Sequence, residues 1–558
     1  MKQTDKSITT AFLLIIMLSI FLRFWDLEII PRWYSDEGTE LNIAWNLVNG
    51  HIRMFAITYT FVPHPPLFFI VAGIGLKIFG NELVVLRMLT ATYGVLTTIL
   101  LYFIGKELFN KRVGLLASFL FAIYPTALIY NRIAFTHNQF MFLSILTFYV
   151  FLRYINTRRD RYFYLTCVCV AMSLVSEYTA IVSFISLFLL SFLYDRKGIK
   201  TAIVTSLAPV IVLVVLMLIL YPTYFVKDVL FQFKRIGFVK LIFGLELIAI
   251  SLVIYLFKKQ IKHISKNILA QLREDFSWLF KDYAELIKPS YILIAIICFF
   301  AILDCQSPQG ILTLPYTESI YMYGIFGLFL IDHKQKRNTA FLFFIPLLGL
   351  FCVVTPNINR ILPILPYFAL GLAIMVFKVY ELFLHHAKLS GKISQVLVAI
   401  LLIHPFLFIT YNDVSAFLDR HRGDIEPIED DLAIAKFINE RVDSEDIVLA
   451  PPYIYQLIQC HTTHLHQAEA IQGKPTYDLG YINPERFLFN CSYRNAKFII
   501  IDNSTRKESY IEQPPLREID SEIKRWPMHL IGEYIIYENP SKMVNYTGYN
   551  TSRRYMTY

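Results

Sequence analysis

Long apolar runs dominate the first 411 residues of the chain. Between Ile8 and Tyr411, runs of 15 to 22 mostly apolar residues alternate with short polar stretches. A helix of about 20 residues crosses the roughly 30 Å hydrocarbon layer of a bilayer with its backbone hydrogen bonds satisfied internally. The pattern therefore predicts a polytopic α-helical membrane protein. Its first helix, Ile8–Trp25, is expected to be retained, because no small-residue cleavage site accompanies it.

Basic residues gather in every second loop of this pattern. Clusters occur at Lys106–Arg112, Arg153–Arg161, Arg196–Lys200, Lys258–Lys288, Lys334–Arg337 and Lys378–Lys392. The loops between them are poor in Lys and Arg, except Tyr221–Phe238, which holds Lys227, Lys234 and Arg235. Because positively charged loops stay inside, we predict about 13 transmembrane helices, an inner amino end and an outer carboxyl end.

The residues after 410 show a different pattern. Helical periodicity is found at Asp430–Val442 and Leu516–Trp526, and strand patterns at Asp446–Ala450, Lys497–Ile501 and Leu530–Tyr537. These segments predict a soluble extracytoplasmic α/β domain over residues 411–558, following a transmembrane domain over residues 1–410. The tail has neither G-x-G-x-x-G nor a P-loop pattern, so no nucleotide site is indicated.

Composition supports this division. Apolar and aromatic residues make up 56% of the chain and charged residues 17%, with a mean hydropathy of +0.50, which excludes a soluble enzyme. Residues 411–558 carry 16 Lys and Arg against 22 Asp and Glu. The basic excess of the first part lies in short loop clusters, so it indicates topology and no nucleic-acid binding. If the tail lies outside the cell, Cys460 and Cys491 are candidates to form a disulfide.

The segment between the first two crossings, residues 26–83, is too long for a simple connection. It contains Trp33 and Tyr34, then Ser35, and then the adjacent carboxylates Asp36 and Glu37. Adjacent carboxylates beside aromatic residues at the end of a membrane helix would lie at headgroup level, where a lipid-linked substrate presents its polar head. The alternative is that the two carboxylates only begin a helix, with Ser35 or Asp36 as its N-cap.

An ordered set of short motifs resembles the GT-C superfamily of polyprenyl-phosphate-sugar-dependent glycosyltransferases. The resemblance is to the branch of protein O-mannosyltransferase-like enzymes and the lipid A aminoarabinose transferase, and it covers about residues 8–380. It rests on Asp36-Glu37, Gly50, His64-Pro65-Pro66-Leu67, Gly80, Arg87, Tyr130-Asn131-Arg132-Ile133-Ala134 and Arg360-Ile361-Leu362-Pro363-Ile364-Leu365-Pro366.

Two motifs depart from the pattern of this branch. Relatives often have Thr-Lys-Tyr where this chain has Ser176-Glu177-Tyr178, which replaces a cation with an acid. The aminoarabinose enzymes have Lys-Pro-Pro where this chain has His64-Pro65-Pro66. These departures allow a substrate that differs from those of both named groups.

The resemblance implies a plasma-membrane enzyme with the GT-C fold that moves a sugar from dolichyl or undecaprenyl phosphate to a glycan, lipid or protein acceptor at the outer face. Asp36 is implied as the general base, with inversion at the anomeric carbon, and Glu37 as a residue that orients the acceptor or an arginine. The leaving phosphate needs cationic compensation as its negative charge develops. The candidates for that role are Arg87, Arg132, Arg360 and His64.

Three further residues, Glu177, His137 and Asn138, are candidate substrate contacts. A carboxylate such as Glu177 inside an apolar hairpin is costly unless it is paired, and a structural role is equally open. For the three arginines, which fall at predicted outer helix ends, the alternative is snorkelling to the membrane interface.

A histidine-rich stretch in the tail, Cys460-His461-Thr462-Thr463-His464-Leu465-His466, has a spacing that can bind zinc if the loop folds around the metal. Three histidines in a polar loop are more often uncoordinated. The oligosaccharyltransferase branch of the superfamily needs a divalent metal and carries Trp-Trp-Asp, which is absent from this chain. We therefore expect catalysis without a metal or other cofactor.

Two other functions fit the same pattern of helices. A transporter or lipid-linked sugar flippase usually places its site at the bilayer midplane, on broken helices related by repeats. No repeat is visible here, and the charged candidates lie towards one face. A surface-polysaccharide polymerase or ligase would share the fold and differ only in its acceptor.

Overall fold

The computed structural model describes residues 2–31, 33–50, 65–220, 319–353, 358–386, 426–465, 489–502 and 514–543, with a few positions between these ranges. The chain forms two compact units. The first comprises residues 1–32 and 62–421, and the second residues 33–61 and 422–558. The sequence predicted residues 26–83 as part of the transmembrane domain. In the structure, residues 33–61 of this predicted outer loop group with the carboxyl-terminal residues.

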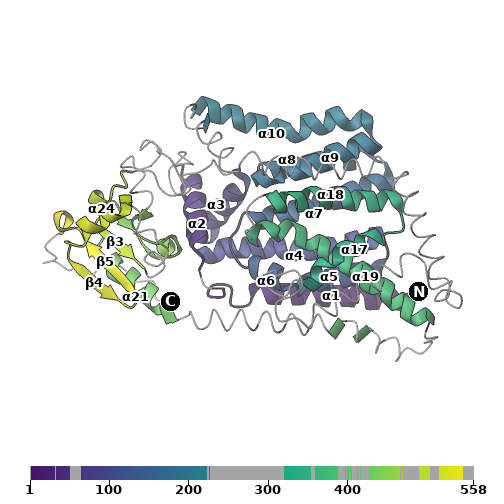
Figure 1. The fold of residues 1–558 in the computed structure, drawn as a ribbon, viewed down its shortest axis with the longest axis horizontal. Helices are drawn as coiled ribbons and strands as arrows, with labels where there is room; N and C mark the ends of the chain where they lie inside the picture. The colour runs from purple at the N-terminus through teal and green to yellow at the C-terminus, as the bar shows by residue number, and fades with distance from the viewer. Residues whose placement is uncertain are drawn as a thin grey trace, which may run out of the picture. The chain divides into compact units, whose positions relative to one another are not determined.

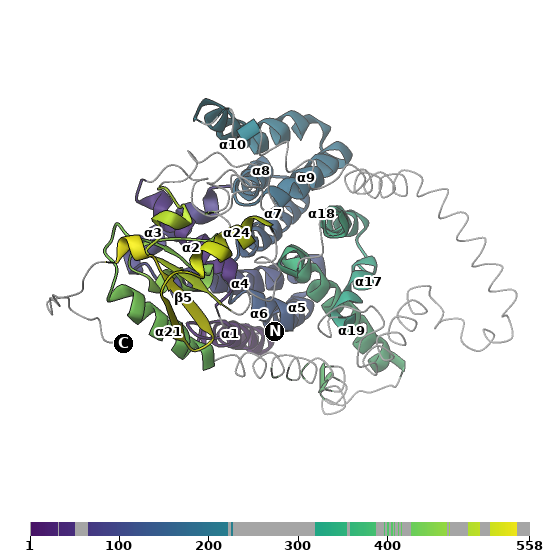
Figure 2. The ribbon, with the colours of Figure 1, turned by 60° about the vertical axis from the view of Figure 1, so that its left-hand side comes forward.

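The first unit is a bundle of helices (Figure 1). Its elements are α1 (Lys2–Phe24), α3 (Leu67–Phe79), α4 (Leu83–Leu108), α5 (Lys111–Ala122), α6 (Pro125–Tyr130), α7 (His137–Thr157), α8 (Asp160–Leu174), η1 (Tyr178–Ala180), α9 (Ile181–Tyr194), η2 (Arg196–Gly198), α10 (Ile199–Leu220), α16 (Ser319–Met322), α17 (Gly324–Phe329), α18 (Lys334–Val353), η3 (Ile358–Ile364) and α19 (Leu365–His386). Figures 1 and 2 both show α10 beside α8 and α9.

Among the described residues, five helical stretches are long and apolar enough to cross a membrane. They are Lys6–Phe24, Leu83–Leu108, His137–Thr157, Arg196–Ile219 and Ile361–Glu381, and two shorter apolar helices cover Leu67–Phe79 and Tyr178–Tyr194. The number of 13 crossings stays a prediction, because residues 227–318, with Lys227, Lys234 and Arg235, lie outside the described residues.

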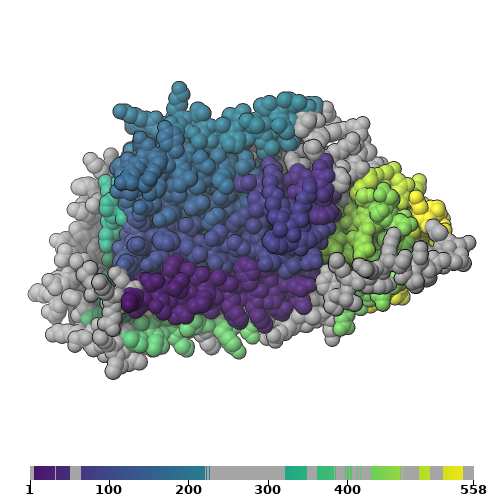
Figure 3. Space-filling view, turned by 180° about the vertical axis from the view of Figure 1, so that it is seen from behind, coloured from purple at the N-terminus to yellow at the C-terminus, as the bar shows by residue number. Residues whose placement is uncertain are grey.

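Helix α1 borders the bundle on one side. Figure 3 shows it in dark purple as a band on the surface of this unit. Its side chains Leu13, Leu14, Met17 and Phe21 are each more than half exposed. An apolar helix face of this kind suits contact with lipid chains.

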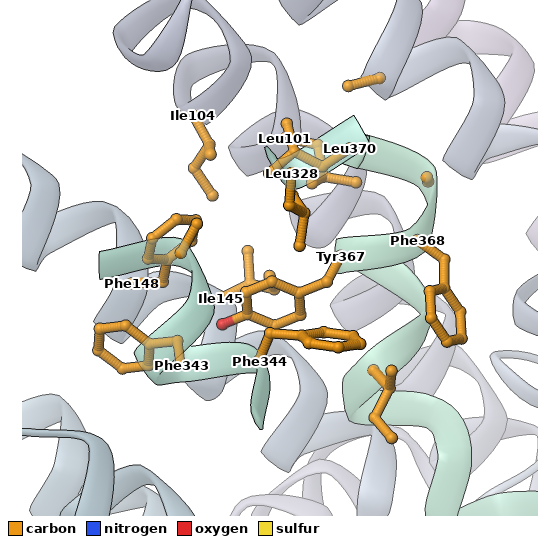
Figure 4. Close-up of a cluster of buried hydrophobic side chains, with 14 of the residues drawn as sticks. Leu101, Ile104, Ile145, Phe148, Leu328, Phe343, Phe344, Tyr367, Phe368 and Leu370 are labelled. Carbon is orange, nitrogen blue, oxygen red and sulfur yellow. The ribbon is translucent and has the colours of Figure 1, made fainter. Parts of the chain in front are cut away.

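The interior of the bundle is built from aromatic and aliphatic side chains. Tyr367 of α19 lies among Phe148 of α7 and Phe343 and Phe344 of α18 (Figure 4). Close helix crossings add to this packing: a Cβ at Gly105 would lie 2.7 Å from the Cα of Gly114. Small residues at such crossings let membrane helices approach each other closely.

The second unit contains a mixed five-stranded sheet. Its elements are α2 (Ser35–Val48), α21 (Glu426–Asn439), β1 (Ile447–Leu449), η4 (Pro452–Leu457), β2 (His461–Thr463), η6 (Tyr493–Asn495), β3 (Phe498–Ile501), α24 (Pro514–Ile523), β4 (Met528–Ile531), β5 (Tyr534–Glu538) and η7 (Pro540–Lys542). The strand order is β2-β1-β3-β5-β4. Strand β1 is parallel to β2 and β3, and β5 is antiparallel to β3 and β4.

Alternating residues of the strands face two separate cores. Phe498 and Ile500 pack in one core with α21, and Ile499 and Ile501 pack in the other with α24. The segment Leu530–Tyr537, expected as one strand, is a hairpin between β4 and β5. Gly532 forms its turn with a φ of +54°, a conformation that glycine adopts without a steric penalty.

Candidate functional site

The predicted carboxylate pair lies at the start of α2. The helix begins at Ser35, and its N-cap is Tyr34, not Ser35 or Asp36. The Tyr34 N–H donates to the carboxylate of Glu37 at 2.9 Å, and the Glu37 N–H donates to the Tyr34 carbonyl at 3.0 Å. Glu37 is fully buried, whereas Asp36 is half-buried. Glu37 thus caps the helix, and Asp36 is the more accessible of the two carboxylates.

The residue that follows this pair packs against another element of the second unit. A Cβ at Gly38 would lie 2.6 Å from the carbonyl carbon of Pro452 and closer still to its oxygen. One turn later, the Asn42 amide donates to the Thr462 hydroxyl at 3.4 Å. Helix α2 therefore contacts η4 and β2 by its backbone and by a side-chain bond.

Two of the predicted phosphate-binding arginines hold the segment that follows α1. The Arg132 guanidinium donates to the carbonyls of Leu22, Trp25, Asp26 and Ile30, at 2.7 Å to Leu22 and 2.8 Å to Ile30. Burial and the charge of Arg87, opposed by Asp26, lower the pKa of Arg132 to about 10, so it stays charged at neutral pH.

Arg87 is fully buried in α4 and contacts the same segment. Its Nη1 donates to the carbonyls of Leu27, Glu28 and Pro31 at 3.1, 3.4 and 2.7 Å. The structure thus brings Arg87 and Arg132 together around residues 22–31. Their described contacts are with backbone carbonyls, so both arginines serve as anchors of this segment, and their predicted binding of phosphate stays a prediction.

A third buried arginine, Arg23, was not singled out from the sequence. It donates from Nε to the Asn131 side-chain oxygen at 3.0 Å and from Nη1 to the Ser19 hydroxyl and the Ala122 carbonyl, both at 3.0 Å. A Cβ at Gly94 would lie 2.6 Å from the Arg23 Nε. The absence of a side chain at Gly94 therefore makes room for this arginine.

Asn138 and Asn131 organise the loop between α6 and α7. Asn131 donates to the Asn138 side-chain oxygen at 2.7 Å, and Asn138 donates to the carbonyls of Tyr130, Ile133 and Phe135. Asn138 is fully buried. The amide predicted as a substrate contact is thus used within the loop that carries Arg132.

Glu177 lies at the same end of the bundle and is almost fully buried. The Thr136 hydroxyl donates to its carboxylate at 2.8 Å. Next to it, the Ser176 hydroxyl donates to Gln139, whose amide donates to the Tyr93 hydroxyl at 2.7 Å. The sequence predicted a partner for this buried carboxylate, and in the described part of the chain that partner is a hydroxyl.

His137 begins α7 beside Thr136 and is half-buried. Whether Glu177 and His137 touch substrate stays a prediction.

Other predicted site residues fall wholly or partly outside the described residues. These are His64, the side chain of Arg360 and His466. The backbone of Arg360 belongs to η3. His461 belongs to β2, and its Nε2 lies 4.0 Å from a carboxylate oxygen of Glu445.

The histidine-rich stretch is therefore partly a strand. Across the described ranges, His, Cys, Asp and Glu form no group of three that could hold a metal. Since His466 lies outside those ranges, the expectation about metals stays a prediction. Cys460 and Cys491 are not bonded to each other, so the disulfide considered from the sequence is not formed in the structure. Burial raises the pKa of each thiol to about 12.

A chain of hydrogen bonds behind η4 was also missed from the sequence. The Tyr453 hydroxyl donates to Asp502 at 2.8 Å and lies 2.9 Å from the Tyr534 hydroxyl, which donates to Asp431. Asp431, Asp502 and Tyr534 are buried. The available signal was the position of Asp502 directly after the buried strand β3, where parallel strands end at a common edge.

The sequence of this chain is similar to those of known proteins. Residues 63–223 match the family "Dolichyl-phosphate-mannose-protein mannosyltransferase". An uncharacterized protein of Aquifex aeolicus (strain VF5) is 25% identical over 177 residues, which are 30% of this chain and 34% of that protein. The match thus spans about a third of the length of this curated relative.

Solved structures of two enzymes share the fold. The archaeal oligosaccharyltransferase AglB from Archaeoglobus fulgidus, in complex with an inhibitory peptide and a dolichol-phosphate, has a TM-score of 0.54 and 14% identity, covering 97% of this chain and 75% of that chain. ArnT from Cupriavidus metallidurans, bound to undecaprenyl phosphate, has a TM-score of 0.56 and 11% identity, covering 95% and 98%. The predicted resemblance to GT-C glycosyltransferases is confirmed, and the chain has a membrane-protein fold of helices.

Proposed function

We propose that this protein is an integral-membrane glycosyltransferase that moves a sugar from a polyprenyl phosphate to an acceptor hydroxyl or amine at the outer face of the membrane. The observation that carries the proposal is the family match over residues 63–223, which contain the buried charged residues Arg87, Arg132 and Glu177. The shared fold with AglB and ArnT, whose structures hold dolichol-phosphate and undecaprenyl phosphate, supports a lipid-phosphate donor.

The chemistry follows from what the reaction requires. The bond from the anomeric carbon to the phosphate oxygen breaks, and a bond to the acceptor forms from the opposite face, through an oxocarbenium-like transition state. Asp36 takes the acceptor proton, and the phosphate leaves as an anion that needs cationic compensation. With Glu37 used as a helix cap, Asp36 is the better base of the pair.

The second role to assign is that of the cations that bind the leaving phosphate. Arg87 and Arg132 donate to backbone carbonyls, so they position residues 22–31 of the first unit. We therefore retain Arg360 and His64 as the first candidates to bind phosphate, with Arg87 and Arg132 as supporting cations. Of Arg360 and His64, Arg360 is the better candidate, because an arginine can bind a phosphate with two parallel hydrogen bonds.

Substitution of the base tests the proposal. The purified protein in nanodiscs is incubated with dolichyl- and undecaprenyl-phosphate mannose and other labelled lipid-phosphate sugars, together with cell-envelope extract. Asp36→Asn preserves shape and removes basicity, so turnover should fall by about 10² or more, while the unfolding temperature stays at the wild-type value.

Glu28→Gln is the matched control, because it removes an exposed carboxylate from the preceding segment. Wild-type turnover in Asp36→Asn would refute the role of Asp36 as a base and would leave it only as a residue in the first turn of α2. Lipid-linked sugar that crosses the bilayer without transfer would instead favour the flippase.

A further inference from the structure

The position of Asp36 depends on the second unit, and this dependence goes beyond its assignment as a base. Helix α2 and residues 422–558 belong to one compact unit. Gly38 meets Pro452 through the backbone, and no side-chain rotation can relieve an added Cβ at this contact. Leu41 and Ala44, three and six residues further along α2, are buried.

The contact with η4 determines which way Asp36 faces. Successive residues of an α-helix are rotated by about 100°, so Asp36 lies about 200° around the helix from Gly38. When Gly38 faces Pro452, Asp36 faces away from η4. The half-buried state of Asp36 agrees with this placement.

Helix η4 is in turn fixed by hydrogen bonds to the rest of the second unit. It follows β1, and its Tyr453 hydroxyl donates to Asp502, at the end of β3, and contacts Tyr534, at the start of β5. Tyr534 donates to Asp431 of α21. Burial and the neighbouring carboxylates raise the pKa of both tyrosines, so both hydroxyls keep their protons at neutral pH.

We propose that Gly38 and Tyr453 are positioning residues for the transfer reaction, and that the carboxyl-terminal unit carries and orients the Asp36 base. The proposal rests on the proposed function. The fold of the second unit then sets the rate of transfer through the position of one carboxylate. Binding of the lipid donor does not depend on this contact.

The size of the effect follows from the distances. A Cβ at position 38 needs about 3.4 Å from the Pro452 carbonyl carbon, whereas the undisturbed helix would place it at 2.6 Å. Because the Pro452 oxygen lies closer still, Gly38→Ala must move α2 by at least about 1 Å, and a misplacement of about 1 Å at a reacting group costs about 10²-fold in rate.

The test compares Gly38→Ala with Gly75→Ala, whose Cβ would lie 3.4 Å from a methyl group of Val85 and is accommodated. We expect kcat to fall about 10- to 100-fold in Gly38→Ala alone. The affinity for undecaprenyl phosphate should stay within about twofold, and the pH profile of kcat should keep its shape. A profile that flattens, as in Asp36→Asn, would mean that the base itself is lost and would contradict a positioning role.

A second pair of variants keeps the test decisive if Gly38→Ala does not fold. Tyr453→Phe removes the hydroxyl that links η4 to Asp502, whereas Tyr455→Phe removes a buried hydroxyl of η4 with no hydrogen-bond partner among the described residues. Hydrogen exchange measured by mass spectrometry should show faster exchange of the α2 amides, by about tenfold, in Tyr453→Phe only.

The outcomes separate this proposal from the proposed function. Unchanged exchange of α2 in Tyr453→Phe, or wild-type kcat in Gly38→Ala, overturns the positioning role. Wild-type turnover in Asp36→Asn overturns the base assignment, and the exchange of α2 still reports whether the helix depends on η4.

Discussion

Replacement of Arg132 by lysine should destabilise the first unit, although it preserves the charge. The guanidinium makes five N–H···O contacts to the carbonyls of Leu22, Trp25, Asp26 and Ile30. A lysine ammonium has three donors at a single point, so at least two contacts are lost. Each hydrogen bond to a charged group is worth about 1.5–3 kcal/mol, which gives a loss of roughly 3–6 kcal/mol.

The assay is thermal unfolding of the detergent-solubilised protein, followed with a dye that reacts with thiols. Cys167 and Cys169 of α8 are buried and become reactive when the bundle opens. At about 2 °C per kcal/mol for a large chain, the midpoint should fall by roughly 6–12 °C.

The control is Arg153→Lys. Arg153 pairs with Glu107 at a partly exposed position of α7, where an ion pair contributes about 0–1 kcal/mol, so the midpoint should change by at most about 2 °C. Equal midpoints for the two variants would refute the anchoring role of Arg132. If Arg132→Lys is stable and loses only affinity for undecaprenyl phosphate, its role is phosphate binding.

Three further predictions concern packing, topology and the second anchor. Gly94→Ala places a Cβ 2.6 Å from the Arg23 Nε, and overpacking of this kind should lower stability by about 1–3 kcal/mol in the same assay; an unchanged midpoint would contradict the close packing. Ser541→Cys should react with an impermeant maleimide on intact cells if residues 411–558 lie outside, and reaction only after lysis would reverse the topology. In this experiment the two native thiols of the second unit, with pKa values of about 12, are only about 10⁻⁴ thiolate at pH 8, so they should give little background labelling. Arg87→Lys should lower the unfolding midpoint together with affinity for undecaprenyl phosphate, whereas lower affinity at an unchanged midpoint would assign Arg87 to the phosphate alone.

Local sequence patterns predicted much of the architecture, because the relevant forces act over short stretches of chain. The apolar runs that become α4 and α7 are long enough to cross a bilayer, and length and hydropathy are visible in a window of about 20 residues. The acidic start of α2 was recognisable for the same reason. Tyr34 is nevertheless its N-cap, because the Glu37 side chain satisfies the Tyr34 N–H.

The roles of the buried charges could not be predicted from such windows. The local sequence around an arginine at a helix end does not distinguish a phosphate ligand from a snorkelling side chain or from an anchor of the backbone. The bonds of Arg132 to Leu22 and Ile30 join residues more than 100 positions apart. The need for glycine at position 38 likewise depends on Pro452, which lies more than 400 residues away. Contacts of this kind appear only when the fold is known.

The two ends of one short segment show how these contacts serve the proposed chemistry. Pro31, in the first unit, is held by the Arg87 guanidinium, and Gly38, in the second unit, packs on Pro452. Asp36 lies between these fixed points, five residues after one and two before the other. A base on a free loop would lose conformational entropy each time it reached its acceptor, whereas a residue two positions before the fixed Gly38 contact has already lost it during folding. The close backbone contact at Gly38 is a costly feature, and its place beside Asp36 gives it a reason that stability alone does not provide.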